Sequence, residues 1–168
     1  MSAAPSPKPL PLAYFLTCST YGSWFHGDAR GSVHPGNNTF LDEPSPPNPI
    51  RERYEVSRLT HPPVTLDEPM RRIVDRTIRE VCSYKGWDLH ALNVRTKHLH
   101  AVVSADRDPE HVMGALKAWC TRRLAEAGLV APGAKVWTRH GSTRYLWDRK
   151  AIGEAANYVL NEQGAPLV

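Results

Sequence analysis

Residues 87–105 have the sequence WDLHALNVRTKHLHAVVSA, and this stretch decides the fold. Residues 87–94 and 98–105 are runs rich in apolar and β-branched side chains, the composition typical of strands. Only the polar tripeptide Arg95-Thr96-Lys97 separates them. Two strand-like runs joined by so short a polar link predict a β-hairpin with a tight turn.

The second of these strands carries two histidines in the middle of an otherwise apolar run. Because side chains alternate across a strand, His98 and His100 project from one face while Leu99 and Ala101 project from the other. Two neutral imidazoles held side by side by a rigid strand form half of a metal site. A His-x-His pair also fits two solvated or hydrogen-bonded histidines, so a third group must decide between these alternatives.

Helical signals flank the hairpin on both sides. Thr65 and Glu68 have the spacing of a capping box and precede apolar residues at helical intervals, which predicts a helix that ends by Gly86. Pro109 opens a second apolar periodicity, which predicts another helix that stops at Gly128.

The remaining elements lie near the two ends of the sequence. Residues 12–22, LAYFLTCSTYG, have the composition of a strand. Residues 136–140 and 143–147 are short strand candidates around a Gly141-Ser142 turn. Asp148 is a suitable N-cap for a last helix that extends to about residue 162.

The resulting order is strand, insertion, helix, strand, strand, helix, strand, helix. This order predicts an α+β fold of the ferredoxin-like (split βαβ) type, an antiparallel sheet with two helices on one face. The insertion, residues 23–63, is rich in glycine, proline and charge, and we expect it to be irregular apart from a short helix near 49–58. Residues 1–11, with four prolines, are expected to form a disordered leader before a single domain at 12–168.

The totals exclude several classes of protein. A chain of 168 residues suits one domain. It contains no apolar run of the roughly 18 to 20 residues that a membrane span needs, and its start lacks the pattern of a signal peptide, so we expect a cytoplasmic protein. The three cysteines, Cys18, Cys82 and Cys120, show no metal-site spacing and are expected to be reduced packing residues.

The last helix offers candidates for the missing third group. Ile152, Ala155 and Val159 belong to one stripe that must face the sheet. Tyr158 and Glu162 are four residues apart, so they lie one above the other on the flank of that stripe. A phenol and a carboxylate are thus presented together where they could meet side chains of the sheet. Gln163 lies further round the helix.

The net charge of +4 and the pI near 9.1 fit a polyanionic partner. Basic residues concentrate in the second half of the chain, and the candidates for nucleic-acid binding are Lys97, Lys117, Arg122, Arg123, Arg139 and Arg144. Trp137, Tyr145 and Trp147 lie close to these in sequence and could stack bases. We expect core packing for at least two of those three aromatic residues.

The HLH triplet, the strand YFLTCSTYG and the helix AANYVLNEQG together resemble the HUH endonuclease superfamily. Within it, the element order resembles the single-tyrosine transposases of the insertion-sequence-200-like and REP-associated types. The resemblance covers most of residues 12–164. In this chain a glutamate, Glu162, occupies the position four residues after the tyrosine, where members of the family often have glutamine or asparagine.

The resemblance implies a metal-dependent endonuclease and strand transferase that acts on single-stranded DNA containing hairpins. Tyr158 would be the nucleophile and would form a 5′-phosphotyrosine intermediate. The metal ligands would be His98, His100 and Glu162, with Gln163 as the alternative third ligand. Mixed imidazole and oxygen ligands suit Mg²⁺ or Mn²⁺, and we expect Mg²⁺ in the cell. The resemblance permits either a monomer or a homodimer.

A second interpretation is a domesticated, catalytically inactive nucleic-acid-binding protein of the same fold. A ferredoxin-like sheet with exposed aromatic residues can also stack bases without cutting them. The formation of a covalent adduct between the protein and DNA separates the two interpretations.

Overall fold

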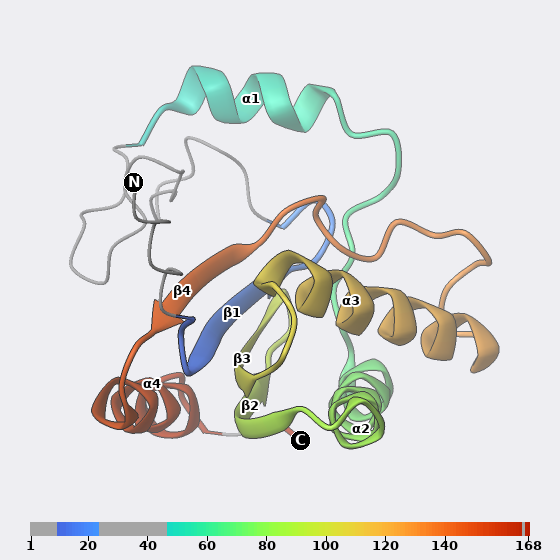
Figure 1. Cartoon of the computed structure of the whole chain (residues 1–168). Coiled ribbons are helices and arrows are strands. Elements are labelled where there is room, and N and C mark those ends of the chain that lie inside the picture. Colours follow the sequence, from blue (N-terminus) through green and yellow to red (C-terminus); the bar gives the residue numbers. More distant parts are fainter. Residues whose placement is uncertain (1–9, 24–46, 166) are drawn as a thin grey trace, which may run out of the picture.

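The computed structural model describes residues 10–23, 47–165 and 167–168. These residues form four strands and four helices (Figure 1). In chain order the elements are β1 (Ala13–Ser19), α1 (Pro49–Ser57), α2 (Glu68–Lys85), β2 (Asp88–Val94), β3 (His98–Ser104), α3 (Pro109–Glu126), β4 (Ser142–Leu146) and α4 (Arg149–Asn161).

The four strands form one antiparallel sheet in the order β2-β3-β1-β4. The hairpin expected at 87–105 is present as β2 and β3, and β1 pairs with the outer side of β3. Each helix between non-neighbouring strands crosses from one to the other, as the split βαβ arrangement requires. The ferredoxin-like α+β fold is therefore confirmed.

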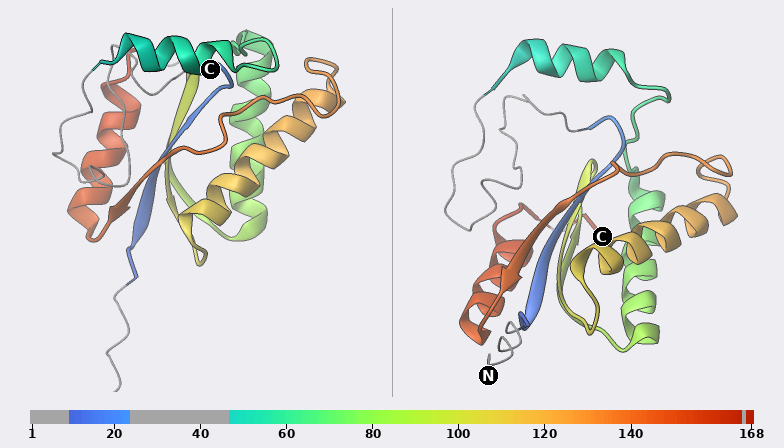
Figure 2. Two further views of the ribbon diagram at one scale, coloured as in Figure 1. Left: turned by 90° about the horizontal axis from the view of Figure 1, so that it is seen from above. Right: turned by 45° about the horizontal axis from the view of Figure 1, so that its top comes forward.

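The sheet separates two apolar cores. On one face, α2 and α3 cover alternate residues of the central strands, among them Leu16 and Val103. On the other face, α4 covers the intervening residues, including Phe15 and Val102, with its own Ala155 and Val159. Both views in Figure 2 show α4 on the side of the sheet opposite α2 and α3. The histidine face of β3 is therefore the face covered by α4.

The start of α2 differs from the sequence expectation. Asp67, and not Thr65, is the N-cap: its carboxylate accepts a hydrogen bond from the backbone N–H of Met70 at 3.0 Å. A proline follows in the first turn, where its missing N–H costs no hydrogen bond. Aspartate serves this position as well as threonine does, so the pattern predicted the helix but selected the wrong cap.

Of the two strand candidates around the Gly141-Ser142 turn, 143–147 corresponds to β4, whereas 136–140 forms no named strand. Both halves of the segment 136–147 pair with β1: residues 142–146 form β4, and Trp137 bridges Thr20 further along the same edge. The ammonium group of Lys117 donates hydrogen bonds to the carbonyls of Thr138 and His140, at 3.0 and 3.2 Å. These bonds stabilise the irregular residues between the two halves, so the chain bulges instead of reversing.

The insertion is only partly described. The expected short helix is confirmed as α1, which has no buried residue and lies apart from the sheet (Figure 1). Residues 58–63, after α1, form no helix or strand, as expected, whereas residues 24–46 and most of the predicted leader 1–11 lie outside the described residues. Among the described residues, no helix is long and apolar enough to cross a membrane.

Gly141 should be intolerant of a side chain. A Cβ added there would lie 2.5 Å from both the Thr17 carbonyl oxygen and the Met113 sulfur. Gly141→Ala should therefore lower the free energy of unfolding by about 1 to 3 kcal/mol, measured by urea denaturation. Gly114→Ala on α3, where a Cβ would meet nothing within 4 Å, is the matched control and should be neutral or stabilising. Equal stability of the two variants would contradict the close packing at Gly141.

Candidate active site

Tyr158 and the histidine pair meet on the α4 face of the sheet. The ring centroids of His98 and His100 are 4.9 Å apart. The ring of Tyr158 lies 6.3 Å from that of His100 and 6.0 Å from that of Phe15, both measured between centroids. Tyr158 keeps 40% of its surface exposed. An accessible phenol therefore lies beside the imidazole of His100, which in turn lies against that of His98.

His100 is the buried member of the pair, with 9% of its surface exposed. Its Nδ1 lies 2.9 Å from the Thr17 hydroxyl oxygen, and Thr17 is the residue directly opposite it on β1. Burial, followed by the neighbouring His98, lowers the pKa of His100 to about 4. The imidazole is thus neutral at pH 7, the form that offers a lone pair to a metal ion.

Gln163, and not Glu162, is the third group that reaches the histidines. The side chain of Gln163 lies beside His100 and favours the charged form of its imidazole. The Glu162 carboxylate instead accepts a hydrogen bond from the side-chain amide of Asn157 at 3.2 Å. Within the described part of the chain, no three His, Cys, Asp or Glu side chains form a metal-binding group. The structure therefore does not bring Glu162 together with His98 and His100.

Asn93, near the end of β2, holds the C-terminal part of α4 against the sheet, and Arg95, just after β2, holds the residues that follow α4. The side-chain amide of Asn93 is buried and donates a 2.9 Å hydrogen bond to the carbonyl of Val159. That carbonyl belongs to the last turn of the helix, whose carbonyls lack partners within the helix. Arg95 donates to the carbonyl of Ala165, at 2.7 Å. Because Asn93 pairs with His100 in the sheet, the strand pair that carries His100 also fixes the helix that carries Tyr158.

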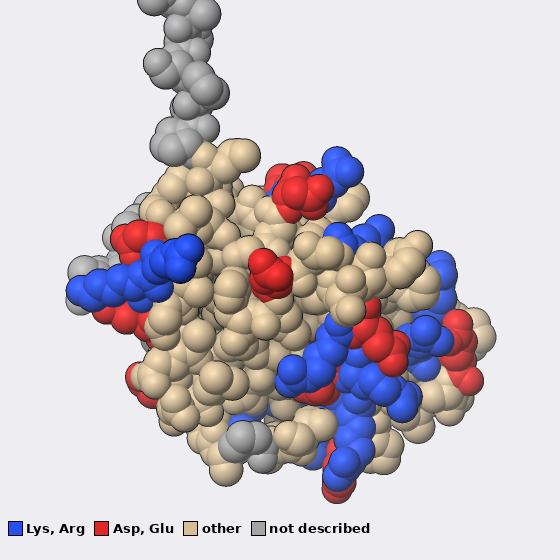
Figure 3. All heavy atoms as spheres, turned by 60° about the horizontal axis from the view of Figure 1, so that its bottom comes forward, with Lys and Arg blue, Asp and Glu red and all other residues tan. Residues whose placement is uncertain are grey.

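Three of the predicted DNA-binding cations lie away from the histidines. Lys117 is half-buried on α3 and bonded to backbone carbonyls, and burial lowers its pKa. Arg122 stacks on Trp119, with its guanidinium carbon 4.7 Å from the ring centroid. Arg123 lies near the carboxylates of Glu80 and Glu126. Figure 3 shows this side of the molecule, over α2 and α3, where Lys and Arg alternate with Asp and Glu.

The other three predicted cations are closer to the site. Lys97 is exposed and directly precedes His98 at the start of β3. Arg139 is exposed in the bulged segment before β4. Arg144 lies directly opposite Phe15 on the neighbouring strand, so both side chains project from the α4 face.

The expectation that at least two of Trp137, Tyr145 and Trp147 pack in the core was wrong. Trp137 is buried, with 9% of its surface exposed, but Tyr145 and Trp147 are 50% and 54% exposed. Only one of the three therefore packs in the core. Tyr145 and Trp147 lie against one another at the end of the edge strand β4, with ring centroids 5.9 Å apart.

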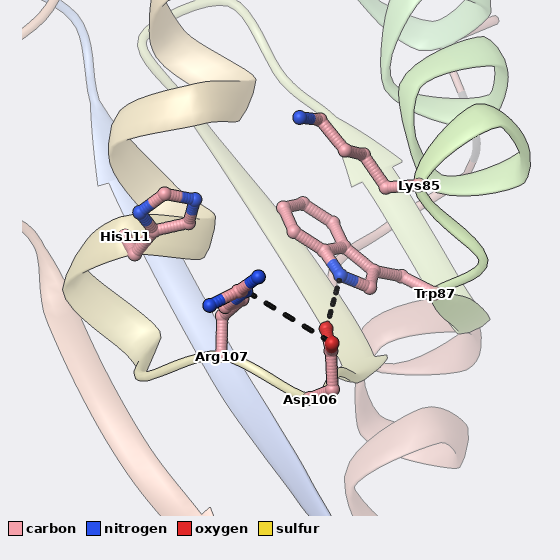
Figure 4. A pocket seen from close by; sticks show the side chains of 5 residues that line it. All are labelled: Lys85, Trp87, Asp106, Arg107 and His111. Carbon is pink, nitrogen blue, oxygen red and sulfur yellow. Dashed lines mark hydrogen bonds and ion pairs between the residues drawn. The ribbon is translucent and has the colours of Figure 1, made fainter.

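A polar pocket lies at the other end of β3 from His98 (Figure 4). Its walls are Lys85, Trp87, Asp106, Arg107 and His111. The Asp106 carboxylate accepts a hydrogen bond from the Trp87 indole and lies 3.9 Å from the Arg107 guanidinium. Its charge is therefore already balanced within the pocket, which shares no residue with the group around Tyr158.

Sequence reasoning missed Phe15, Thr17 and Asn93 as members of the site. Alternation in β1 places Phe15 and Thr17 on one face, but only the pairing of β1 with β3 shows that this is the histidine face. Asn93 gave one signal: it is a polar residue in the otherwise apolar run ALNV. A buried polar side chain in a strand requires a hydrogen-bond partner, but the sequence does not say that the partner is α4.

The solved structures that are similar to this chain include two transposases. One is a REP-associated tyrosine transposase bound to a REP hairpin, with 10% identity and a TM-score of 0.47 over 95% of this chain and 70% of that one. The other is a proposed transposase from Deinococcus radiodurans R1, with 17% identity and a TM-score of 0.46 over 98% of this chain and 99% of that one. No family model and no curated protein matches the sequence.

The low pKa of His100 predicts acid sensitivity of the fold. Above pH 6.5 this imidazole is neutral in both the folded and the unfolded chain. As the pH falls towards 4, the unfolded chain binds a proton that the folded chain does not, so stability falls. This one group should remove about 2 kcal/mol of unfolding free energy between pH 7 and 5, measured by urea denaturation in a chelator.

His100→Asn should remove that component of the pH dependence. His111→Asn, an exposed substitution on α3, is the matched control and should keep the full dependence. The same loss between pH 7 and 5 in the wild type and in His100→Asn would contradict the assignment.

The Asn93 hydrogen bond predicts a local effect on α4. Asn93→Leu keeps the branching at Cγ but removes the donor, so the last turn of α4 should open more readily, by about 1 to 2 kcal/mol. Hydrogen exchange followed by mass spectrometry should show faster exchange in α4 and unchanged exchange in α2. The control is Asn157→Ala on the exposed side of α4. If Asn93→Leu exchanges in α4 no faster than this control, Asn93 does not hold the helix.

Proposed function

We propose that this chain is a metal-dependent HUH-type tyrosine transposase, which cuts single-stranded DNA and joins it to another strand. The observation that carries the proposal is the meeting of Tyr158 with His98 and His100 on one face of the sheet. The phenol comes from a C-terminal helix and the imidazoles from the central hairpin. If residue 158 had only a packing role, phenylalanine would fill the position equally well, because its ring packs in the same way.

In the proposed reaction, the Tyr158 oxygen attacks the scissile phosphorus and the bond from phosphorus to the 3′-oxygen breaks. The 5′ end of one fragment is then linked to the tyrosine through its phosphate. The 3′-oxygen of the other fragment leaves and takes up one proton, which balances the proton lost by the phenol, to give a free 3′-hydroxyl. Attack by a 3′-hydroxyl of another strand reverses the step and joins the strands. The covalent link stores the energy of the broken bond, so no external energy source is needed.

The side chains around His100 fit a divalent cation. Two imidazoles and an amide oxygen are a mixed nitrogen and oxygen set that suits Mn²⁺ and accepts Mg²⁺. The contact of Gln163 with His100 favours this glutamine over Glu162 as the third ligand. Thr17 would orient the His100 ring from the opposite side through Nδ1. The bound cation would polarise the scissile phosphate as a Lewis acid.

The remaining side chains would bind and orient the DNA. Phe15 packs against both Tyr158 and His100 and so limits where the phenol can lie. Arg144, opposite Phe15 on the same face, is placed to meet a phosphate. The substrate we propose is single-stranded DNA that contains a hairpin, with Mg²⁺ as the metal ion in the cell.

The decisive test is a covalent adduct. The protein is incubated with Mn²⁺ and labelled single-stranded DNA libraries that contain hairpins, and the products are separated on a denaturing gel. The wild type should form an adduct with the 5′ end of a fragment, and Tyr158→Phe should form none. Tyr84→Phe, an exposed tyrosine on α2, is the matched control and should react as the wild type does. Tight binding without an adduct would overturn the proposal in favour of a non-catalytic binding protein.

The third ligand can be tested in the same assay. Gln163→Ala should raise the Mn²⁺ concentration required for half-maximal adduct formation about 10- to 100-fold, whereas Glu162→Ala should change it little. The reverse order would restore Glu162 as the ligand.

A further inference from the structure

The turn that follows β1, residues 19–23, gathers three other segments of the chain. The backbone N–H of Thr20 donates to the carbonyl of Lys97, and that of Tyr21 to the carbonyl of Val136, each at 2.8 Å. The N–H of Thr138 donates to the carbonyl of Ser19 at 3.0 Å. The third segment, 58–66, joins the turn through the backbone N–H of Val64, which donates to the carbonyl of Tyr21 at 2.8 Å. Backbone hydrogen bonds thus hold the segments 58–66, 95–98 and 135–139 around one turn.

These segments bring like charges together. The turn and the stretches 58–66, 95–98 and 131–141 contain Arg58, Arg95, Lys97, Lys135 and Arg139 but no aspartate or glutamate. By contrast, the arginines of α2 have carboxylates close by, as Arg72 has Glu68 and Arg79 has Asp75, each at 2.7 Å. A concentration of unmatched positive charge opposes folding through repulsion and favours an anionic partner.

Three exposed cations from this group, Lys97, Lys135 and Arg139, are named here the basic sheet end. Their main chain is fixed by the bonds described above. The ammonium group of Lys135 also donates to the Thr60 hydroxyl at 3.2 Å and lies 5.9 Å from the centroid of the Tyr21 ring. The charge of Lys135 is therefore held near the turn, and the partners that it has among the described residues are neutral.

The basic sheet end adjoins the candidate active site. Ser19, the first residue of the turn, pairs with His98 across the sheet, and Lys97 is the residue before that histidine. Arg139 follows Thr138, which is bonded to Ser19. A nucleic-acid strand with its phosphate at His98 would meet this surface within the next few nucleotides.

We propose that the basic sheet end binds the phosphates of single-stranded DNA next to the scissile bond. This inference rests on the proposed function for the identity of its partner. It assigns the binding of the DNA phosphates to Lys97, Lys135 and Arg139. The role predicted from the sequence for Lys117, Arg122 and Arg123 is withdrawn. Phosphate contacts of this kind position a strand without selecting its sequence.

The test compares two triple variants that remove the same charge. Lys97→Gln, Lys135→Gln and Arg139→Gln are combined in one protein, and Arg76→Gln, Arg122→Gln and Arg123→Gln in the matched control. Binding of a fluorescein-labelled 20-nucleotide oligothymidylate is followed by anisotropy in a chelator from 50 to 200 mM salt. The first triple variant should bind about 100-fold more weakly near 0.1 M salt, and the slope of log K against log salt should decrease by about 2.

The control triple variant should bind within about threefold of the wild type, because Arg76 and Arg123 lie near Glu80 and Glu126 and Arg122 stacks on Trp119. Equal weakening of both triple variants would overturn the proposal, since net charge alone would then explain binding. So would wild-type binding by the first triple variant. Thermal unfolding verifies that each protein is folded. If the first triple variant does not fold, the single charge-reversal variants Lys97→Glu, Lys135→Glu and Arg139→Glu are measured in its place.

This experiment is independent of catalysis, because it uses a chelator and measures no cutting. If the wild type binds through the basic sheet end but forms no adduct at Tyr158, the surface assignment stands and the transposase proposal fails. If the adduct forms and the first triple variant binds normally, the transposase proposal stands and the surface assignment fails.

Discussion

The packing of α4 on the histidine face of the sheet is the constraint on which the candidate site depends. Ala155 and Val159 are buried against Phe15 and Val102, and the small alanine lets the helix approach the strands closely. These apolar contacts are non-directional. They set the distance between α4 and the sheet but not the position of the helix along the strands. The directional bond from Asn93 to Val159 supplies that position at the turn that carries Tyr158.

The same face shows how a sheet can hold polar groups at modest cost. His100 is buried, but it is neutral, bonded to Thr17 and beside Gln163. The buried amide of Asn93 is likewise satisfied by a helix carbonyl. Each polar group thus meets a partner from a different element, which ties β1, β2, β3 and α4 together. A sheet face filled with valine would be at least as stable. The polar side chains on this face are therefore better explained by a functional role than by a contribution to stability.

The fold could be predicted from the sequence because local signals agreed with one another. The short polar link at 95–97 fixed the hairpin, and the two amphipathic periodicities fixed α2 and α3. The prediction failed where contacts between residues far apart in the sequence determine the local structure. At 136–141, the carbonyls bonded by Lys117 and the tight approach of Gly141 to Thr17 produce a bulge where the local pattern indicated a turn.

The site was predictable only in part for the same reason. His98, His100 and Tyr158 could be chosen from strand and helix spacing, and their meeting was confirmed. The choice of Glu162 over Gln163 rested on an ideal helix continuing through both residues, but α4 ends at Asn161. Beyond a helix end the regular rotation of side chains stops, so spacing could not tell which of the two residues turns towards His100.

The most direct test of the central claim is mass spectrometry of the C-terminal tryptic peptide, residues 151–168, after reaction with single-stranded DNA and Mn²⁺. Tyr158 is the only tyrosine in that peptide. After nuclease digestion, the account predicts that this peptide gains the mass of a 5′-phosphorylated nucleotide attached to Tyr158. An unmodified peptide in a sample whose DNA has been cut, or the same added mass on a peptide lacking Tyr158, would contradict it.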